Sequence, residues 1–418
     1  MNRLIDDELV SFLLHDVLDV ASLTALPRFA AHSPEGFDMA VQSAARFARE
    51  VMAPTVRAME ADPPRFEDGR IRTHAALKDM YAQMVEQGFL TMARSEDVGG
   101  MQFPTTIALT VSAYLGAANM GAAGYLGLTH GAARLIESFG TAALKEAFMR
   151  PMYEGRFTGT MALTEPQAGS SLADVRTKAT PEGDHYLIEG EKIFISGGDN
   201  TFAENIVHLT LARIDGAPPG IKGVSLFVVP AKRLEGGALV SNDVAPSGLF
   251  HKIGWKGLPS IALKYGDEGK CHGYLVGKPG DGLKHMFQMM NEARLNVGMA
   301  GVSNCSAAYQ ASLEYARARP QGRALTNRDA TSPQIPITAH ADVRRMLLAQ
   351  KAIVEGGLSL LLQCGKYQDL AEAAEGETKQ RAQKLLDLLT PIAKSFPAEK
   401  GFESNVLAIQ VHGGYGYT

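Results

Sequence analysis

The stretch Met161-Ala-Leu-Thr-Glu-Pro-Gln-Ala-Gly-Ser-Ser171 is the most informative part of this 418-residue chain. It begins as a short apolar strand and runs into a turn. Thr164, Ser170 and Ser171 place hydroxyl groups beside two small residues, which allow a flat ligand to approach the backbone closely. The same residues could also form an ordinary strand and turn with solvated hydroxyls. Other parts of the chain must therefore decide whether this is a ligand site.

The composition is that of a globular protein, with 45% hydrophobic and 21% charged residues. The length predicts two or three cores. The net charge of −4 argues against nucleic-acid binding, and no apolar run approaches the roughly 18 residues that a membrane span needs. The eleven histidines show no metal-ligand spacing, so we expect no metal.

Two features predict a cytoplasmic location. Cys271, Cys305 and Cys364 are odd in number and far apart, which indicates reduced structural thiols. The N-terminus carries Asp6, Asp7, Glu8 and Asp16, and this acidity argues against a secretory or mitochondrial targeting segment. Apolar residues there recur at helical spacing and predict one amphipathic helix, with an apolar face of Leu4, Ile5, Leu9, Phe12, Leu13, Val17 and Leu18.

The hydrophobic period changes twice along the chain. Residues 36–157 have helical spacing, residues 158–280 contain short β-branched and aromatic runs, and helical spacing returns from 281 to 418. We therefore predict an α+β fold, with an N-terminal helical extension (1–35), a helical domain, a central β domain built as a small sandwich or barrel, and a C-terminal helical domain. Pro391 and Pro397 should kink or break the last helix.

Four further blocks accompany the opening stretch, whereas a G-x-G-x-x-G fingerprint and a P-loop are both missing. In Glu191-Lys-Ile-Phe-Ile-Ser-Gly-Gly198, strand alternation places Phe194 and Ser196 on one side, where they would suit a flat redox ring. A core Phe with a surface Ser is the alternative. The other blocks are Gly280-Asp-Gly282 with Asn291-Glu-Ala-Arg294, then Tyr315-Ala-Arg-Ala-Arg-Pro-Gln-Gly322 with Ala339–Arg345, and Gln410-Val-His-Gly-Gly-Tyr-Gly416. Arginines and glycines at helix ends suit phosphates, although capping explains them equally well.

In order and spacing, these five blocks resemble the acyl-CoA dehydrogenase family from about residue 36 to 418. The likeness is greatest to its long bacterial branch, which contains methylmercaptopropionyl-CoA dehydrogenase; GTMALTEPQAGSS, GEKIFISGG, YARARPQGR and QVHGGYGY carry it. The resemblance implies FAD as cofactor, an acyl-CoA substrate, an electron-transfer flavoprotein as electron acceptor, and a homodimer. It also implies α,β-dehydrogenation of the thioester, with a carboxylate that removes the α-proton.

The resemblance assigns roles to individual residues. The backbones of Met161 and Leu163 and the hydroxyl of Thr164 would contact the flavin ring, beside Phe194 and Ser196. Ser170 would lie near the flavin phosphate and the substrate, and Arg294 would line the active site. The contacts to FAD across the dimer interface would come from Arg319, Gln410, Gly413 and Gly414.

The catalytic base is the main departure from the family pattern. The usual Glu lies in a Tyr-Glu-Gly-Thr-like motif beyond the His-Gly-Gly block, and this chain ends at Thr418, so we expect a C-terminally truncated form. Some relatives place the base immediately before the helix Arg, where this chain has Ala293. Glu292 is one residue earlier, about 100° around the helix, and is a weak candidate. Pro320 and Pro397 also stand where relatives usually lack proline.

Two alternatives remain open at this point. The missing base is compatible with a non-catalytic flavin- or CoA-binding protein of the same fold. A flavoprotein oxidase of the same superfamily, such as a nitroalkane-type oxidase, would form peroxide rather than pass electrons to a partner flavoprotein.

Overall fold

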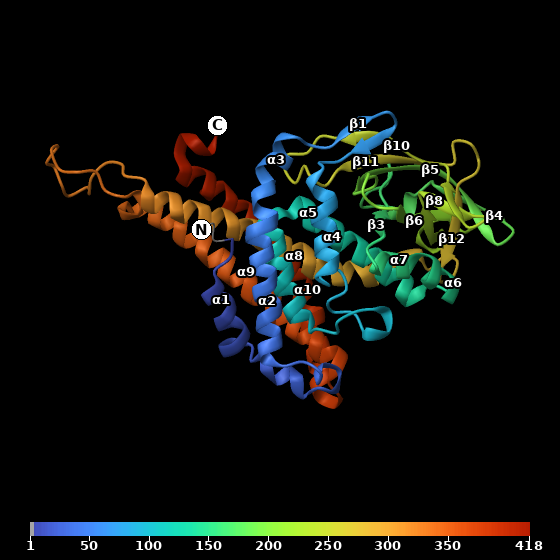
Figure 1. The fold of residues 1–418 in the computed structure, drawn as a ribbon, viewed down its shortest axis with the longest axis horizontal. Helices are drawn as coiled ribbons and strands as arrows, with labels where there is room; N and C mark the ends of the chain where they lie inside the picture. Colours follow the sequence, from blue (N-terminus) through green and yellow to red (C-terminus); the bar gives the residue numbers. More distant parts are fainter. Residues whose placement is uncertain (1–3) are drawn as a thin grey trace. The chain divides into compact units, whose positions relative to one another are not determined.

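The computed structural model describes residues 4–418, apart from the side chains of residues 288–292. The chain divides into two compact units that do not follow chain order. The bundle unit comprises Met1–Pro54, Gln102–Met120 and Arg294–Thr418, and the sheet unit comprises Thr55–Met101 and Gly121–Ala293. Figure 1 shows their helices and strands, coloured along the sequence.

Long helices build the bundle unit. It contains α1 (Asp7–Phe12), α2 (Pro34–Phe47), the first part of α5 (Thr105–Phe139), most of α8 (Gly282–Ala318), α9 (Ala341–Ala373) and α10 (Gly376–His412). Short 3₁₀ or π turns connect them: η1 (Leu13–Val17), η2 (Val20–Ala25), η3 (Pro27–Phe29), η4 (Ala48–Met52), η5 (Ala53–Thr55), η10 (Ile337–Ala339) and η11 (Gly413–Gly416). By length and composition alone, α9 could cross a membrane. Its buried residues Leu358, Leu361 and Leu362 are equally expected of a core helix.

The N-terminal extension is part of this bundle. Leu4, Ile5 and Val10 are almost fully buried, and the Ser306 hydroxyl of α8 donates to the Leu4 carbonyl at 2.9 Å. The prediction of one amphipathic helix was only partly correct. α1 ends at Phe12 and continues as a π turn, so Phe12 and Val17 are exposed instead of lying on the apolar face.

The last helix, α10, continues through both of its prolines, so the predicted break at Pro391 or Pro397 was wrong. Close packing against α8 explains why the helix persists. A Cβ atom at Gly298 would lie 2.2 Å from the carbonyl oxygen of Ala393, the residue four before Pro397. Glycine at that position lets the two backbones approach closely, and this contact supports the helix where proline removes a hydrogen bond.

A buried carboxylate joins two helices of the bundle unit. Asp369 of α9 accepts hydrogen bonds from the backbone N–H groups of Thr105 and Thr106 and from the Thr106 hydroxyl. It therefore caps the first turn of α5, whose N–H groups have no partner within the helix. Burial raises the pKa of Asp369 to about 7, although these three donors favour the charged form.

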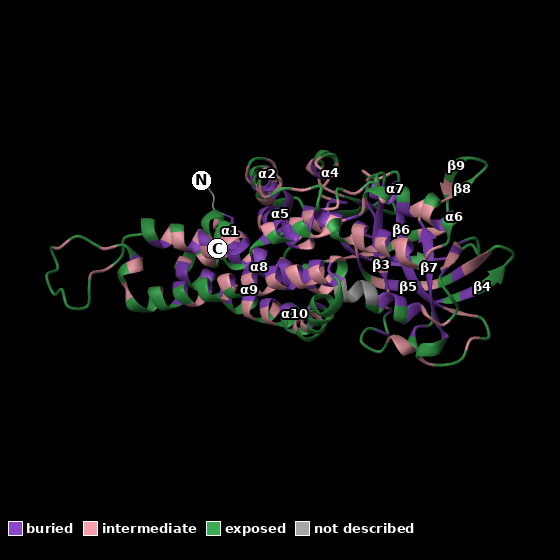
Figure 2. Ribbon diagram, turned by 90° about the horizontal axis from the view of Figure 1, so that it is seen from below, coloured by how far each residue is buried: buried purple, intermediate pink, exposed green. Residues whose placement is uncertain are grey.

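The sheet unit contains one large sheet in the strand order β10-β11-β5-β12-β7-β6-β3, with β4 beside β5 and β6. Its strands are β3 (Phe157–Ala162), β4 (Lys178–Glu182), β5 (His185–Ser196), β6 (Asn205–Ile214), β7 (Val224–Pro230), β10 (Val244–Phe250), β11 (Ser260–Tyr265) and β12 (His272–Val276). Every residue of β7 is buried (Figure 2). Two apolar clusters fill the two faces of this sheet, in agreement with the predicted central β domain.

Smaller elements complete the sheet unit. They are the hairpins β1 (Arg65–Glu67) with β2 (Arg70–Arg72) and β8 (Lys232–Glu235) with β9 (Ala238–Ser241), and the helices α3 (Val56–Ala61), α4 (Ala76–Glu86), α6 (Ala142–Leu144) and α7 (Arg150–Tyr153). The turns are η6 (Glu96–Val98), η7 (Lys145–Met149), η8 (Leu172–Asp174) and η9 (Ile221–Gly223).

A buried ion pair connects β3 to β5. The Lys192 ammonium lies 2.8 Å from Glu165 Oε1, and both side chains are almost completely buried. The ammonium also donates to the Leu163 carbonyl at 3.1 Å. The Glu165 carboxylate accepts further bonds from the N–H groups of Arg176 and Thr177 and from the Thr177 hydroxyl. Burial opposes ionisation of Glu165, but the Lys192 charge and these donors outweigh it and lower the carboxyl pKa to about 2.

Removal of one partner of the Glu165–Lys192 ion pair should therefore destabilise the protein. We expect Lys192→Met to lower the free energy of unfolding by about 3–5 kcal/mol, because it leaves the Glu165 charge buried without its cation. Urea unfolding followed by circular dichroism measures the change. The matched control is Lys264→Met on β11, whose pairing with Asp267 is solvent-exposed and should contribute less than about 1 kcal/mol. Equal losses in the two variants would contradict a structural role for the buried pair.

The same pair predicts a pH dependence of stability. The folded-state pKa of Glu165, about 2, lies below its ordinary value of 4.5. Its contribution to stability is thus complete above pH 4.5 and is lost as the pH falls toward 2. The difference in unfolding free energy between the wild type and Glu165→Gln should narrow over that interval. A difference that stays constant in urea titrations across it would show that Glu165 does not titrate this way.

Candidate functional site

The stretch from Met161 to Ser171, called the opening stretch here, leaves the end of β3 and forms a tight turn. Glu165 and Ala168 exchange two backbone hydrogen bonds, from the Glu165 N–H to the Ala168 carbonyl at 2.9 Å and back at 3.0 Å. Ala168 is buried beneath the turn, whereas Gly169 and Ser170 are exposed. The buried Glu165 fixes this turn to Lys192, so the exposed backbone that follows it has a defined position.

The edge of the sheet offers backbone groups to a ligand. Among the described strands, β3 pairs only with β6, in parallel register, and therefore has a free edge. The Gly159 N–H already uses that edge to donate to the Thr129 hydroxyl. Alternate residues of a strand direct their backbone groups to the same edge. Met161 consequently presents its N–H and carbonyl there, as the predicted flavin contact requires.

Leu163 and Thr164 continue this edge and are half-buried. The Thr164 carbonyl accepts a bond from the Ile193 N–H at 2.9 Å, which joins the opening stretch to the second sequence block. Both blocks therefore lie at one end of the same sheet. Their assignment to the flavin ring remains a prediction.

Phe194 does not continue a regular strand. The register between β5 and β11 shifts between the pairs Leu263–Lys192 and Ile261–Ile195, which leaves one extra residue on β5. Phe194 sits in this bulge at φ +59°, with 57% of its surface exposed and its ring 4.5 Å from that of Phe250. The alternative of a core Phe was therefore wrong, and so was the regular alternation used to predict its direction. An exposed aromatic on a bulge suits the face of a planar ligand.

Ser196 closes β5 opposite Ser260 and is half-buried. Ser170 is exposed beyond the turn. Among the described residues, neither hydroxyl has a hydrogen-bond partner, whereas the neighbouring Ser171 hydroxyl donates to Asp174 at 2.7 Å.

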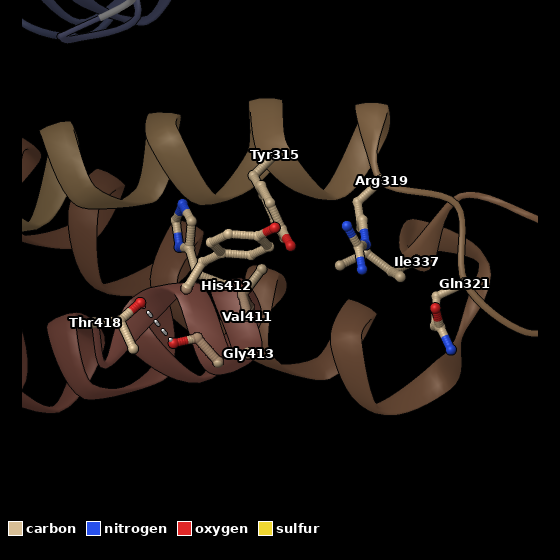
Figure 3. Close-up of a pocket in the computed structure, with 10 residues that line it drawn as sticks. Tyr315, Arg319, Gln321, Ile337, Val411, His412, Gly413 and Thr418 are labelled. Atoms are coloured by element: carbon tan, nitrogen blue, oxygen red, sulfur yellow. Dashed lines mark hydrogen bonds between the residues drawn. The ribbon is translucent and has the colours of Figure 1, made fainter.

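The bundle unit contains a separate cavity of about 430 Å³ at the ends of α8 and α10 (Figure 3). Its walls come from the last turns of the two helices, from the segment after α10 and from the loop that precedes α9. The lining residues are Tyr315, Arg319, Gln321, Ile337, Val411, His412, Gly413, Gly414, Tyr415 and Thr418. Arg319, Gly413 and Gly414 were predicted to share one ligand, and the structure brings these three together. Gln410 is not in the lining; its side chain accepts a bond from the Tyr417 hydroxyl at 3.1 Å.

An aromatic pair forms one wall of this cavity. The rings of Tyr315 and His412 stack with their centroids 4.7 Å apart. The Arg319 side chain, which follows the end of α8, lies beside this pair (Figure 3). His412 Nδ1 lies 2.9 Å from the Ala408 carbonyl, so the neutral ring carries its proton there and leaves Nε2 as an acceptor. A guanidinium, glycine backbone and a flat aromatic wall together suit a nucleotide diphosphate.

Pro320 does not distort the end of α8. The Arg319 N–H still bonds to the Tyr315 carbonyl at 2.9 Å, and the Arg319 carbonyl accepts from the Ile337 N–H at 2.9 Å. Pro320 instead opens the loop that returns at Pro336.

The predicted catalytic residues are less well defined. Arg294 lies in α8 and is half-buried, and Ala293 packs against an apolar cluster of the sheet unit. Glu292 lies outside the residues whose side chains the structure describes.

Two features of the structure were not predicted from the sequence. The roles of Glu165 and Lys192 were missed, although Lys192 follows Ile188 and Gly190 at inward-facing strand spacing, which was a usable signal. The stacking of Tyr315 on His412 had no signal, because the two residues are 97 positions apart in the sequence.

Known proteins share this fold and these blocks. Residues 34–156, 160–265 and 280–418 match the N-terminal, middle and C-terminal domains of acyl-CoA dehydrogenases. The chain is 38% identical to 3-methylmercaptopropionyl-CoA dehydrogenase of Ruegeria pomeroyi over 90% of its own length and 64% of that protein. It is 34% identical to the broad-specificity linear acyl-CoA dehydrogenase FadE5 of Mycobacterium tuberculosis, over 86% of the chain and 60% of that protein.

A solved structure has the same fold. Butyryl-CoA dehydrogenase from Megasphaera elsdenii superposes with a TM-score of 0.72 at 22% identity, covering 91% of this chain and 89% of that one. By contrast, the chain spans less than two thirds of the length of the Ruegeria pomeroyi and Mycobacterium tuberculosis relatives. Three matched domains in the family's order cover most of its length. The chain belongs to the acyl-CoA dehydrogenase family.

Proposed function

We propose that this protein binds FAD and catalyses the α,β-dehydrogenation of an acyl-CoA thioester. The observation that carries the proposal is the joint placement of Met161, Thr164 and Phe194 at one end of the sheet. The free strand edge, the exposed aromatic and the turn fixed by Glu165 fit one face and edge of a flavin ring. The relatives named above are acyl-CoA dehydrogenases, which supports the same reaction class.

The residues of this chain would have distinct tasks. Backbone groups of Met161 and Leu163 and the hydroxyls of Thr164 and Ser196 would orient the flavin ring, and Phe194 would cover it. Arg319, Gly413 and Gly414 would hold a pyrophosphate in the bundle cavity. When bound, FAD supplies a hydride acceptor, and the protein contributes position and exclusion of water.

The partners follow from the same proposal. We propose an electron-transfer flavoprotein as electron acceptor, a homodimer in which each copy supplies the bundle cavity to the FAD of the other, and a cytoplasmic location. A non-catalytic flavin- or CoA-binding protein is the second candidate, because residues 1–418 do not contain the Tyr-Glu-Gly-Thr-like motif that carries the family's usual base. Glu292 is the candidate base within this chain.

An anaerobic absorbance titration tests the reaction. We expect the 418-residue protein to carry oxidised flavin, which bleaches when a linear acyl-CoA such as butyryl-CoA is added if the base lies within this chain. If bleaching occurs, Glu292→Gln should abolish it, with Glu314→Gln on the same helix as control. Bound flavin that stays oxidised with every acyl-CoA would favour the non-catalytic candidate, and absence of flavin binding would overturn both.

Mutation of the bundle cavity tests the cofactor assignment. We expect Arg319→Ala to weaken FAD binding by about 10- to 100-fold, because charge-assisted bonds to a phosphate contribute about 1.5–3 kcal/mol. Fluorescence titration of the apoprotein measures the dissociation constant. Arg328→Ala, an exposed arginine in the following loop, is the matched control and should leave it unchanged. The same affinity in both variants would exclude the bundle cavity as the pyrophosphate site.

A further inference from the structure

The buried ammonium of Lys192 has a second acceptor besides Glu165. It donates to the Leu163 carbonyl at 3.1 Å, and this carbonyl belongs to the peptide that joins Leu163 to Thr164. The Glu165 carboxylate receives three further hydrogen bonds from other groups, so its charge is shared among several donors. A cation therefore lies at the carbonyl end of one peptide of the opening stretch.

The opposite end of the same peptide is available to a ligand. The Leu163–Thr164 peptide is trans, so its N–H points away from its carbonyl and hence away from Lys192. The next carbonyl, that of Thr164, already accepts from the Ile193 N–H at 2.9 Å. Among the described residues, neither the N–H nor the hydroxyl of Thr164 has a hydrogen-bond partner. Half-buried Thr164 thus keeps two donors for the flavin ring that is proposed to lie there.

The charge of Lys192 changes the strength of the Thr164 N–H as a donor. A hydrogen bond to the carbonyl of a peptide polarises the whole group and makes its N–H a stronger donor. Because Lys192 and Glu165 are almost completely buried, little water screens this effect. Burial lowers the pKa of Lys192 to about 8, and the Glu165 carboxylate opposes this shift, so the amine is charged at neutral pH.

A stronger donor favours the reduced form of the flavin over the oxidised form. Hydride from the β-carbon of the acyl thioester brings two electrons and one proton to the flavin, while the α-proton goes to the base and the thioester becomes α,β-unsaturated. The reduced ring therefore carries one more negative charge than the oxidised ring. A polarised N–H, with a cation behind it, stabilises that additional charge more than it stabilises the neutral ring.

We propose that Lys192 is a positioning residue that raises the reduction potential of the bound flavin by acting through the Leu163–Thr164 peptide. This inference rests on the proposed function, because it requires a flavin beside Thr164. It assigns a redox task to a side chain that is completely buried. A purely structural role predicts a different result, because a loosened turn would weaken the binding of oxidised and reduced flavin equally and leave the potential unchanged.

Redox titration of the flavin-loaded protein at pH 7 tests this role of Lys192. The double variant Glu165→Gln/Lys192→Met removes both charges, so no unpaired charge is left in the interior to destabilise the fold. We expect reduction of its flavin to be about 10-fold or more less favourable than in the wild type, which is a fall of about 30 mV for two electrons. Anaerobic titration beside a reference dye of known potential measures the midpoint.

The matched control disturbs the same cluster without removing a charge. Thr177→Val deletes the hydroxyl that donates to Glu165 Oε1 at 2.6 Å and leaves both members of the ion pair in place. We expect it to lower the free energy of unfolding and to keep the midpoint of the wild type. An unchanged midpoint in the double variant, or an equal fall of the midpoint in Thr177→Val, would overturn the proposed role of Lys192.

The affinities of the apoprotein for the two forms of FAD give a second readout. The double variant should lose about 10-fold or more affinity for reduced FAD than it loses for oxidised FAD, because the two affinities and the midpoint form a closed thermodynamic cycle. Equal losses would leave Lys192 a structural role only, with the proposed function intact. A wild-type protein that binds no FAD would instead overturn the proposed function, and this inference with it.

Discussion

The ion pair between Glu165 and Lys192 holds the sheet end of the candidate site together. It joins a turn to a strand 27 residues later, and it does so in the interior, where neither charge is tolerated alone. Because the ammonium also binds the Leu163 carbonyl, the pair fixes the chain on both sides of Thr164. The exposed backbone after the turn is ordered by these buried contacts rather than by its own small residues.

The separate cavity of the bundle unit depends on different interactions. In the bundle cavity, the Arg319 guanidinium, the glycine backbone after α10 and the stack of Tyr315 on His412 come from the ends of two helices. The Ala408 carbonyl sets the tautomer of His412, so even this ring is oriented by a helix end. The sheet unit thus presents the free edge of β3 and the exposed ring of Phe194. The bundle cavity presents the Arg319 guanidinium and the dipoles of helix ends.

Sequence reasoning succeeded where a local pattern encodes the structure. The β-branched and aromatic runs at residues 205–213 and 223–230 predicted β6 and β7. The arginine and the glycines of two distant blocks, which were predicted to share one ligand, line one cavity. Sequence reasoning failed where the deciding partner is remote. The continuity of α10 through Pro397 depends on Gly298, almost a hundred residues earlier, and the bulge at Phe194 depends on the register of β11. Neither a close helix approach nor one extra strand residue has a local signature.

The conformation of Phe194 also bears on how this chain can change over time. A bulky residue at φ +59° costs about 1–3 kcal/mol, and glycine or asparagine would relieve most of that cost. Selection for thermal stability alone would therefore replace this phenylalanine readily, since its ring is exposed and contributes little to the core. Strained backbone of this kind is found most often at functional sites, which agrees with the proposed place of the ring over the flavin. Variant libraries screened only for heat resistance should lose Phe194 early, and with it the proposed cover of the flavin ring.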